Sequence, residues 1–297
     1  MIKFFFSSVL LLLSWCFISV NKVQAQVNFH EMGKWQDSLL RLEGQIKVLQ
    51  SDAERLEKNF VFVKTLVSSL KERHAYLFNF DKLSSITVLR SPDDSFRIFS
   101  WNIDLNDGSY LYYGAIQRKT KDGKLSLVPL LDKTFEIQKP EEALLSPDNW
   151  YGARYYDIQP LGNAYVLLGW KGHNADYTQK VIEILHLQND QFILGKTLFA
   201  DQPNSQRRIF NFSKQASMYL KFDRPQERLI FDHIVPANSS FTGNFKYYGP
   251  DLSYDAYLLK GGKLLLKSDV PFANAPHADD NSAIIPGQAI PKMKSGL

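Results

Sequence analysis

The sequence predicts a mainly β protein of the α+β class, in which an N-terminal helical segment precedes an antiparallel meander of about eleven or twelve strands. Two observations carry this prediction. Apolar residues recur every three or four positions from Trp35 to Leu70, which is a helical period. After Phe80 the period changes to two, and turn-forming residues separate the apolar runs, which is typical of β-hairpins.

The helical segment carries an apolar seam whose steps alternate between four and three residues, the spacing of a coiled coil. The seam consists of Trp35, Leu39, Leu42, Ile46, Leu49, Ala53, Leu56, Phe60, Val63, Val67 and Leu70. One continuous helix over residues 34–74 would be about 60 Å long at 1.5 Å per residue. The alternative is a helical hairpin, because Ser51-Asp52-Ala53-Glu54 is a capping box that can begin a second helix.

The remainder of the folded chain is predicted to be a succession of hairpins. Asn106-Asp107-Gly108, Gly162-Asn163, Asn189-Asp190 and Gly261-Gly262 each separate two alternating runs, and turns this short join antiparallel strands. We expect a barrel or a sandwich. A propeller-like arrangement is the alternative, but no repeat of about 40–50 residues supports it. The expected strands span residues 96–105, 109–118, 125–131, 155–161, 164–170, 180–187, 192–199, 217–222, 228–234, 255–259 and 263–267.

The N-terminus has the pattern of a secretory signal peptide. Lys3 precedes an apolar run over residues 4–20, and the small residues Val23 and Ala25 predict cleavage after Ala25. Cys16 is the only cysteine, so the mature chain would be free of cysteine and would have no disulfide or thiolate site. We therefore expect a secreted or periplasmic protein with no stable membrane span after cleavage.

These patterns divide the chain into four parts. Residues 1–25 form the signal peptide, 26–80 the helical segment, 81–270 the antiparallel β domain and 271–297 a proline-rich tail that is expected to be disordered. The net charge of +4 falls to +2 when Lys3 and Lys22 are removed (4 − 2 = 2). Such a balance gives no reason to expect nucleic acid as a partner.

The chain contains none of the common catalytic signatures. The nucleophile elbow GxSxG, the phosphate loop GxxxxGK[ST] and the zinc motif HExxH are all missing from the sequence. No two histidines stand at the spacing of metal ligands. No cofactor and no metal ion are therefore predicted.

Three residues are weak candidates for catalysis: Asp232, His233 and His173. The first two lie in LIFDHIVP, toward the end of an apolar strand, and catalytic groups often lie at the ends of strands. Neighbours in a strand point to opposite faces, so Asp232 and His233 cannot act as a direct pair. A site would need a partner such as His173 or Asp255. The alternative is an aspartate that accepts hydrogen bonds from backbone amides.

Aromatic residues supply the weak candidates for binding. In WYGARYYD (150–157) strand alternation places Tyr151 and Tyr155 on one face and Tyr156 on the other. An open face would offer rings for stacking on a sugar or another flat ligand. The preferred interpretation is that these rings fill the core and that Gly152 lets a second strand approach.

The segment GWKGHNADY (169–177) is a longer turn than a minimal hairpin needs. Trp170 and His173 belong to it and complete the set of binding candidates. Gly172 and Asn174 suit a turn, and His173 is expected at its exposed apex. We interpret the segment as a hairpin loop that forms a binding edge, with catalysis as the lesser alternative.

Five stretches together resemble a group of uncharacterised secreted proteins of Bacteroidota. They are SPDDSFRIFSWNIDLNDGSYLYYGAIQ, SPDNWYGARYYDIQPL, YVLLGWKGHN, LIFDHIVP and YYGPDLSYDAYLLKGGKL. The resemblance spans about residues 85–270 and implies a bacterial envelope protein of the periplasm. The family has no established activity, so the resemblance supplies no catalytic residue.

Three functions are consistent with the sequence. The first is a non-enzymatic binding or assembly module of the cell envelope, with a glycan or an envelope protein as partner. The second is a hydrolase that acts on a glycan with Asp and His residues at strand ends; a glycosidase of this kind needs two carboxylates in one cleft. The third is a structural oligomer that self-associates through the 34–74 helix.

Overall fold

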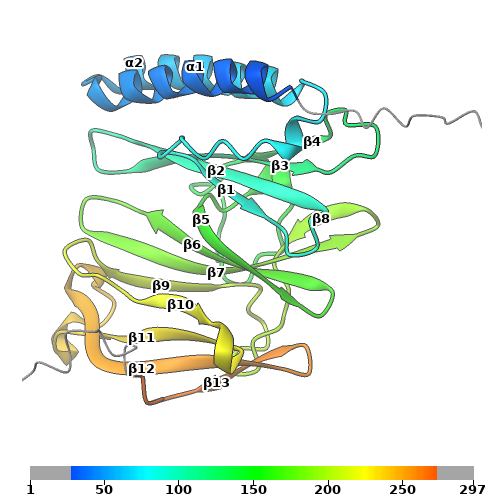
Figure 1. Cartoon of the computed structure of the whole chain (residues 1–297). Coiled ribbons are helices and arrows are strands. Elements are labelled where there is room, and N and C mark those ends of the chain that lie inside the picture. The colour runs from blue at the N-terminus through cyan, green and yellow to red at the C-terminus, as the bar shows by residue number, and fades with distance from the viewer. Residues whose placement is uncertain (1–27, 273–297) are drawn as a thin grey trace, which may run out of the picture.

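The computed structural model describes residues 28–272. The predicted signal peptide, its cleavage after Ala25 and nearly all of the predicted tail lie outside the described residues. The described chain forms four stacked layers, a helical pair followed by three antiparallel sheets (Figure 1). The mainly β class and the antiparallel pairing are confirmed, whereas the described strands form three separate sheets and no closed barrel.

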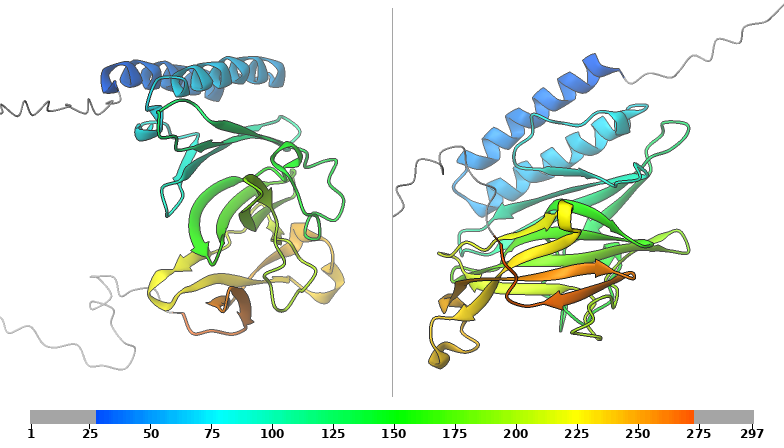
Figure 2. Two further views of the ribbon diagram at one scale, coloured as in Figure 1. Left: turned by 90° about the vertical axis from the view of Figure 1, so that its right-hand side faces the viewer. Right: turned by 60° about the horizontal axis from the view of Figure 1, so that its bottom comes forward.

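The helical segment is a hairpin. Helices α1 (Phe29–Val48) and α2 (Asp52–Leu70) lie side by side (Figure 2), and Trp35 Nε1 near the start of α1 donates to Glu72 Oε1 just after α2, at 3.2 Å. Leu49 is extended, and Ser51 is the N-cap of α2 as the capping box predicts, although its side chain makes no capping hydrogen bond. No described helix is long and apolar enough to cross a bilayer.

The predicted seam is only partly buried. Leu39 and Leu70 are buried within the chain, whereas Phe60 is 58 % exposed. Phe62 and Leu66, which lie beside the seam, are buried instead. Because the chain reverses direction after α1, each helix packs against the other and against the first sheet, which displaces the buried face from the heptad positions.

The first sheet is a simple meander. It has the order β1-β2-β3-β4 with every pair antiparallel, and the predicted Asn106-Asp107-Gly108 turn joins β2 to β3, with Gly108 at φ +84°. The sheet comprises β1 (Thr87–Arg90), β2 (Phe96–Asp104), β3 (Tyr110–Arg118) and β4 (Leu127–Leu131).

The second and third sheets continue the same pattern. The second has the order β5-β6-β7-β8, with β9 also paired to β7, and the third has the order β10-β11-β12-β13. Their strands are β5 (Arg154–Leu161), β6 (Ala164–Gly172), β7 (Tyr177–Gln188), β8 (Gln191–Leu194), β9 (Arg208–Ser213), β10 (Leu220–Asp223), β11 (Arg228–Pro236), β12 (Tyr248–Lys260) and β13 (Lys263–Lys267). Short 3-10 turns lie at η1 (Ala75–Leu77), η2 (Pro147–Asn149), η3 (Arg224–Gln226), η4 (Ser239–Phe241) and η5 (Phe245–Tyr247).

Each pair of neighbouring layers encloses its own apolar core. Strand β2 shows how one strand serves two cores: Phe96 and Ile98 face the second sheet, whereas Phe99 and Trp101 face the helices. In the second sheet Leu167 faces the first sheet, and its neighbours face the third. Burial of one such side chain contributes about 1.5–3 kcal/mol, so every sheet is stabilised from both sides.

Charged residues also lie inside these cores. The side chains of Glu183 and Arg207 are fully buried and form an ion pair at 2.8 Å, and Arg207 also donates to the carbonyls of Ala143 and Leu194 at 2.8 and 3.1 Å. The extra hydrogen bonds satisfy the guanidinium, which a buried ion pair requires. Arg207 thereby fixes the connection between β4 and β5 to the second sheet.

Candidate binding site

The binding candidates from the sequence separate into two cavities around the β6–β7 turn. Tyr151 and His173 line one cavity of about 430 Å³, here called the His173 groove. Trp170 lines a second cavity of about 400 Å³, here called the Trp170 groove. Asp232 and His233 line neither, and Tyr155 is buried in the core.

Strand alternation explains why one turn serves two cavities. On β7, Tyr177 and Gln179 line the His173 groove, whereas Thr178 and Lys180 line the Trp170 groove. Successive side chains of a strand point to opposite faces of the sheet. The two grooves therefore lie on opposite faces of the second sheet, at the end where β6 turns into β7.

Three rings form the apolar wall of the His173 groove. The His173 and Tyr177 rings stack with centroids 4.5 Å apart and planes at 23°. The ring of Phe245, from η5, follows Tyr177 at 5.4 Å. Phe135 also lines the groove and is 70 % exposed. The stacked pair covers one face of each of its own rings, and the four rings together give the groove apolar surface against which a ligand can pack.

A row of polar groups lines the same groove. Tyr151 Oη donates to Gln179 Oε1 at 2.8 Å, and Gln179 Nε2 donates to Asn211 Oδ1 at 2.6 Å. Burial raises the pKa of Tyr151, partly offset by Gln179, so the phenol stays a hydrogen-bond donor at neutral pH. Asn211 is half-buried, and within residues 28–272 its amide nitrogen has no hydrogen-bond acceptor.

Two carboxylates complete the rim of the His173 groove. Glu141 Oε1 accepts from Arg208 Nη1 at 3.0 Å and from the Ile209 amide at 2.9 Å. Glu142 is exposed and pairs with Lys139 at 3.5 Å. Carboxylate oxygens at the rim can accept hydrogen bonds from a ligand's hydroxyls.

The turn itself is held firmly. Asn174 Oδ1 accepts from the backbone amides of Asp176 and Tyr177 at 2.9 and 3.0 Å. A Cβ on Gly108 would lie 2.9 Å from Ala175 Cα, so the β2–β3 turn packs directly on this loop.

His173 was expected to be exposed, but it is only half-exposed, and its Nδ1 is buried without a partner among the described residues. Burial and, to a lesser extent, Lys171 lower the pKa of His173.

The structure does not bring the catalytic candidates Asp232 and His233 into the groove that His173 lines. Asp232 Oδ2 accepts from the Tyr219 amide at 2.6 Å, as the alternative interpretation anticipated. His233 Nδ1 lies 3.0 Å from Asp251 Oδ2 in an exposed pair that closes a bulge between β11 and β12. Burial raises the pKa of Asp232.

The aromatic stretch 150–157 fills the interior. Tyr155 is 1 % exposed and accepts from Trp150 Nε1 at 2.9 Å. Tyr156 Oη donates to the Leu220 carbonyl at 3.0 Å and so joins the second sheet to the third. A Cβ on Gly152 would collide with Tyr112 of β3, which is the close approach that the glycine was predicted to permit. An open ring platform on β5 is therefore not what the chain forms.

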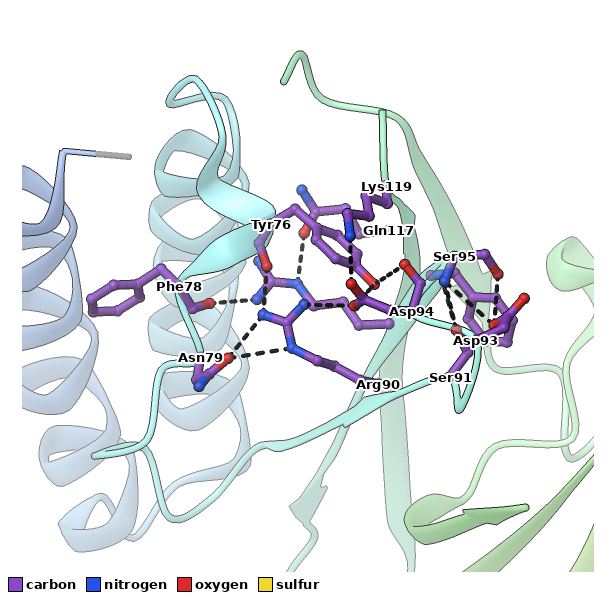
Figure 3. Close-up of polar contacts among 12 residues, drawn as sticks. Tyr76, Phe78, Asn79, Arg90, Ser91, Asp93, Asp94, Ser95, Gln117 and Lys119 are labelled. Carbon is purple, nitrogen blue, oxygen red and sulfur yellow. Dashed lines mark hydrogen bonds and ion pairs between the residues drawn. The ribbon is translucent and has the colours of Figure 1, made fainter. Parts of the chain in front are cut away.

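A dense polar network lies on the first sheet, and its role is structural (Figure 3). Arg97 of β2 is fully buried and donates to Gln117 Oε1 at 2.8 Å and to the carbonyls of Ala75 and Phe78, which follow α2. Burial lowers the pKa of Arg97 to about 9. These bonds fasten the segment after α2 to the first sheet.

Asp94 is the anionic centre of the same network. It accepts from Tyr76 Oη at 3.1 Å and from Arg90 Nη1 at 3.3 Å, and it pairs with Lys119. The dashed contacts in Figure 3 run between these side chains, so Asp94 and the cations around it are hydrogen-bonded within the chain. The network therefore leaves no free group for a ligand.

A further cavity of about 400 Å³ separates the helices from the first sheet. Its central group, Glu43, accepts from Ser84 Oγ, from Lys47 Nζ and from both the amide and the hydroxyl of Ser85 at 2.5–2.8 Å. Burial raises the pKa of Glu43, but the hydrogen bonds from Lys47, Ser84 and Ser85 outweigh it and lower the pKa to about 2. This carboxylate anchors the loop before β1 to α1.

Sequence reasoning missed Gln179, Asn211 and Phe245. The first two look like ordinary polar positions of alternating strands, and Phe245 comes from a segment with no strand pattern.

Among residues 28–272 no three His, Cys, Asp or Glu residues are grouped to hold a metal ion. No family model, curated protein or solved structure matches the chain.

Proposed function

We propose that the protein is a non-enzymatic, glycan-binding module of the cell envelope, secreted or periplasmic, and that the His173 groove is its binding site. One observation carries the proposal: the aromatic rings of His173, Tyr177 and Phe245 line the same groove as the amides of Gln179 and Asn211. A sugar ring has an apolar face of C–H groups and an edge of hydroxyls, so it needs both kinds of surface together.

The size and rigidity of the groove support this proposal. A volume of about 430 Å³ falls within the range of about 300–1,000 Å³ that is usual for small-ligand sites. Tyr177 and Gln179 lie on the central strand pair of the second sheet, and Asn174 and Gly108 hold the adjoining turn. A site held in this way loses little conformational entropy when it binds.

The partners of the two rim carboxylates favour binding over hydrolysis. A glycosidase needs one carboxyl group that is protonated and can donate to the leaving oxygen. Glu141 is held as an acceptor by Arg208 and an amide, and Glu142 is exposed beside Lys139. Of Asp232, His233, His173, Asp176 and Asp255, only His173 lines any of the four cavities considered.

The test is binding of the mature chain (26–297) to an array of neutral and acidic oligosaccharides, followed by calorimetry on each bound saccharide. Tyr177→Ala and Asn211→Ala should each weaken binding at least tenfold. Leu252→Ala is the control, because Leu252 is 89 % exposed on the third sheet, and it should bind as the parent does. The same saccharides should elute with unchanged chain length after overnight incubation.

The proposal is wrong if no saccharide binds, or if both groove variants bind as tightly as the parent. Shortened saccharides after incubation would instead favour the hydrolase. The predicted compartment is tested separately, by finding whether the N-terminus of protein isolated from the expressing bacterium begins at Gln26.

A further inference from the structure

The Trp170 groove differs from the His173 groove in its charge. It lies on the face of the second sheet that is turned toward the third sheet. The residues that matter are Tyr110 of β3, Trp170 of β6, Lys180 of β7, Phe212 of β9, Lys214 and Met218. Two of these six residues are cationic and none is anionic.

The two lysines have no ion-pair partner among the described residues. Neither Lys180 nor Lys214 forms an ion pair or a side-chain hydrogen bond within residues 28–272. Asp176 pairs with Lys246 at 3.0 Å, whereas Asp232 acts on Lys180 electrostatically but makes no ion pair with it. Lys214 is exposed, but Lys180 is half-buried, and an ammonium group that is partly removed from water without an ion-pair partner is costly.

Burial of Lys180 makes its unpaired positive charge more costly. The residue is half-buried, and burial lowers its pKa, with Asp232 acting in the opposite direction and Lys221 in the same direction. An anion bound in the groove would stabilise the charged form of Lys180 and recover part of the cost of its burial. The groove is thus electrostatically complementary to a negative group.

Aromatic rings position the two ammonium groups. Lys214 Nζ lies 5.3 Å from the centroid of the Tyr110 ring, and Lys180 Nζ lies 5.2 Å from that of Tyr156. Trp170 meets Tyr110 edge to face at 5.3 Å and 89° and is half-exposed. Phe212 and Met218 add apolar lining. Ring surface and positive charge therefore occur together in one groove.

We propose that the Trp170 groove is a second, anion-selective subsite, which binds the carboxylate or sulfate group of an acidic sugar. Lys180 and Lys214 hold the anionic group, and the sugar ring packs against Trp170. This inference rests on the glycan-binding function proposed above and adds the substrate class: the preferred glycans carry negative charge.

The experiment compares matched acidic and neutral probes. One pair is tetragalacturonate and its fully methyl-esterified form; the other is a sulfated carrageenan tetrasaccharide and its desulfated form. Calorimetry on the mature chain at 50 and 500 mM NaCl should show at least tenfold tighter binding of one acidic probe than of its neutral partner. The preference should shrink at high salt, because salt screens exposed charges. The pair that responds identifies carboxylate or sulfate as the anionic group.

Substitutions test whether the preference for acidic probes arises in the Trp170 groove. The double variant Lys180→Met/Lys214→Met keeps apolar stems of similar length and should bind the acidic and neutral probes equally. Trp170→Ala should weaken both. The double variant Lys260→Met/Lys267→Met is the control, because it removes the same two charges from exposed sites on β12 and β13, and it should keep the full preference. Thermal melting of each variant confirms that it is folded.

The outcomes separate this inference from the proposed function. Equal binding of acidic and neutral probes by the parent protein, or a preference that survives in the double variant, overturns the anion subsite and leaves glycan binding intact. Absence of binding to all four probes, together with array binding of neutral sugars that depends on Tyr177, also overturns only the subsite. Absence of any binding on the array overturns both.

Discussion

Lys171 gives the chain an unusual dependence of stability on pH. Its side chain is 1 % exposed between the first and second sheets, where Nζ donates to Thr134 Oγ1 at 2.7 Å and to the Gly152 carbonyl. The rings of Tyr112 and Tyr151 lie 4.4 and 4.3 Å from Nζ. Burial lowers the pKa of Lys171 from 10.5 to about 7, with Asp132 acting in the opposite direction.

The direction of the effect follows from proton counts. Between pH 7 and pH 10.5 the unfolded chain holds the Lys171 proton and the folded chain has released it, so the free energy of unfolding rises with pH. Below pH 7 both states are protonated, and the folded state bears the full cost of the buried charge. With about 1.4 kcal/mol per pH unit at full difference, and partial titration at both limits, stability should rise by about 3 kcal/mol from pH 7 to 9.5.

The substitution Lys171→Met removes this titration and keeps an apolar stem of similar shape. Urea unfolding of both proteins, measured at intervals of half a pH unit from 7 to 9.5, gives the difference between their stabilities as a function of pH. This difference cancels the titration of all other groups. The parent should gain about 3 kcal/mol relative to the variant across the window. Parallel curves would refute the reasoning and would mean that the ring faces and the two acceptors keep the ammonium fully charged.

Three further substitutions test the packing. Glu183→Gln should cost about 3–5 kcal/mol in urea unfolding, because it leaves the buried Arg207 without its counter-charge; a cost below about 1 kcal/mol would contradict this. Gly152→Ala should cost about 1–3 kcal/mol and lower the melting temperature, because its Cβ would meet Tyr112 in a filled core. Gly44→Ala should stabilise the chain by about 1 kcal/mol, because no atom lies within 4 Å of the new Cβ and alanine favours the helix; unchanged stability would show that α1 is frayed there.

Local features of the fold could be predicted from the sequence because they depend on local chemistry. The Asn106-Asp107-Gly108 turn needs a residue at positive φ, and Gly108 supplies it. The break before Ser51 followed from the capping box, although the choice between one helix and two depended on what α1 packs against. Strand β12 begins at Tyr248, seven residues before the predicted start at residue 255 (255 − 248 = 7), because a bulge interrupts its alternation.

The stacking of sheets could not be predicted in the same way. Strands β1 and β9 were missed: β1 has only four residues, and β9 pairs with β7, which is distant in sequence. A meander pattern is the same whether its sheets close into a barrel or stack, since the difference lies in which faces meet. Buried charges make the sheet faces harder to assign from sequence. A lysine in a strand, such as Lys171, is normally assigned to the solvent face, and only the fold shows that Thr134 and Gly152 accept its hydrogen bonds in the interior.

The binding residues could be predicted only in part, because the role of a side chain depends on its neighbours in the fold. Tyr151 and His173 stood out by residue type, and the fold brings them into one groove. The lysines of the Trp170 groove did not stand out, because a lysine is informative only when its counter-charges are known. Asp176 lies close to both lysines in sequence or pairing, yet the structure pairs it with Lys246 from another part of the chain.

Each layer of the stack is built from one uninterrupted stretch of chain, from the helices at 29–70 to the third sheet at 220–267. Strand pairing within each layer therefore stays inside that stretch of chain. A chain that folds from its N-terminus can therefore complete one layer before the next one begins. At each stage one apolar sheet face, such as that of Val166 and Leu168, stays uncovered until the next layer packs against it. The third sheet ends this sequence, with Val270 and Phe272 packed against it as a closing strip.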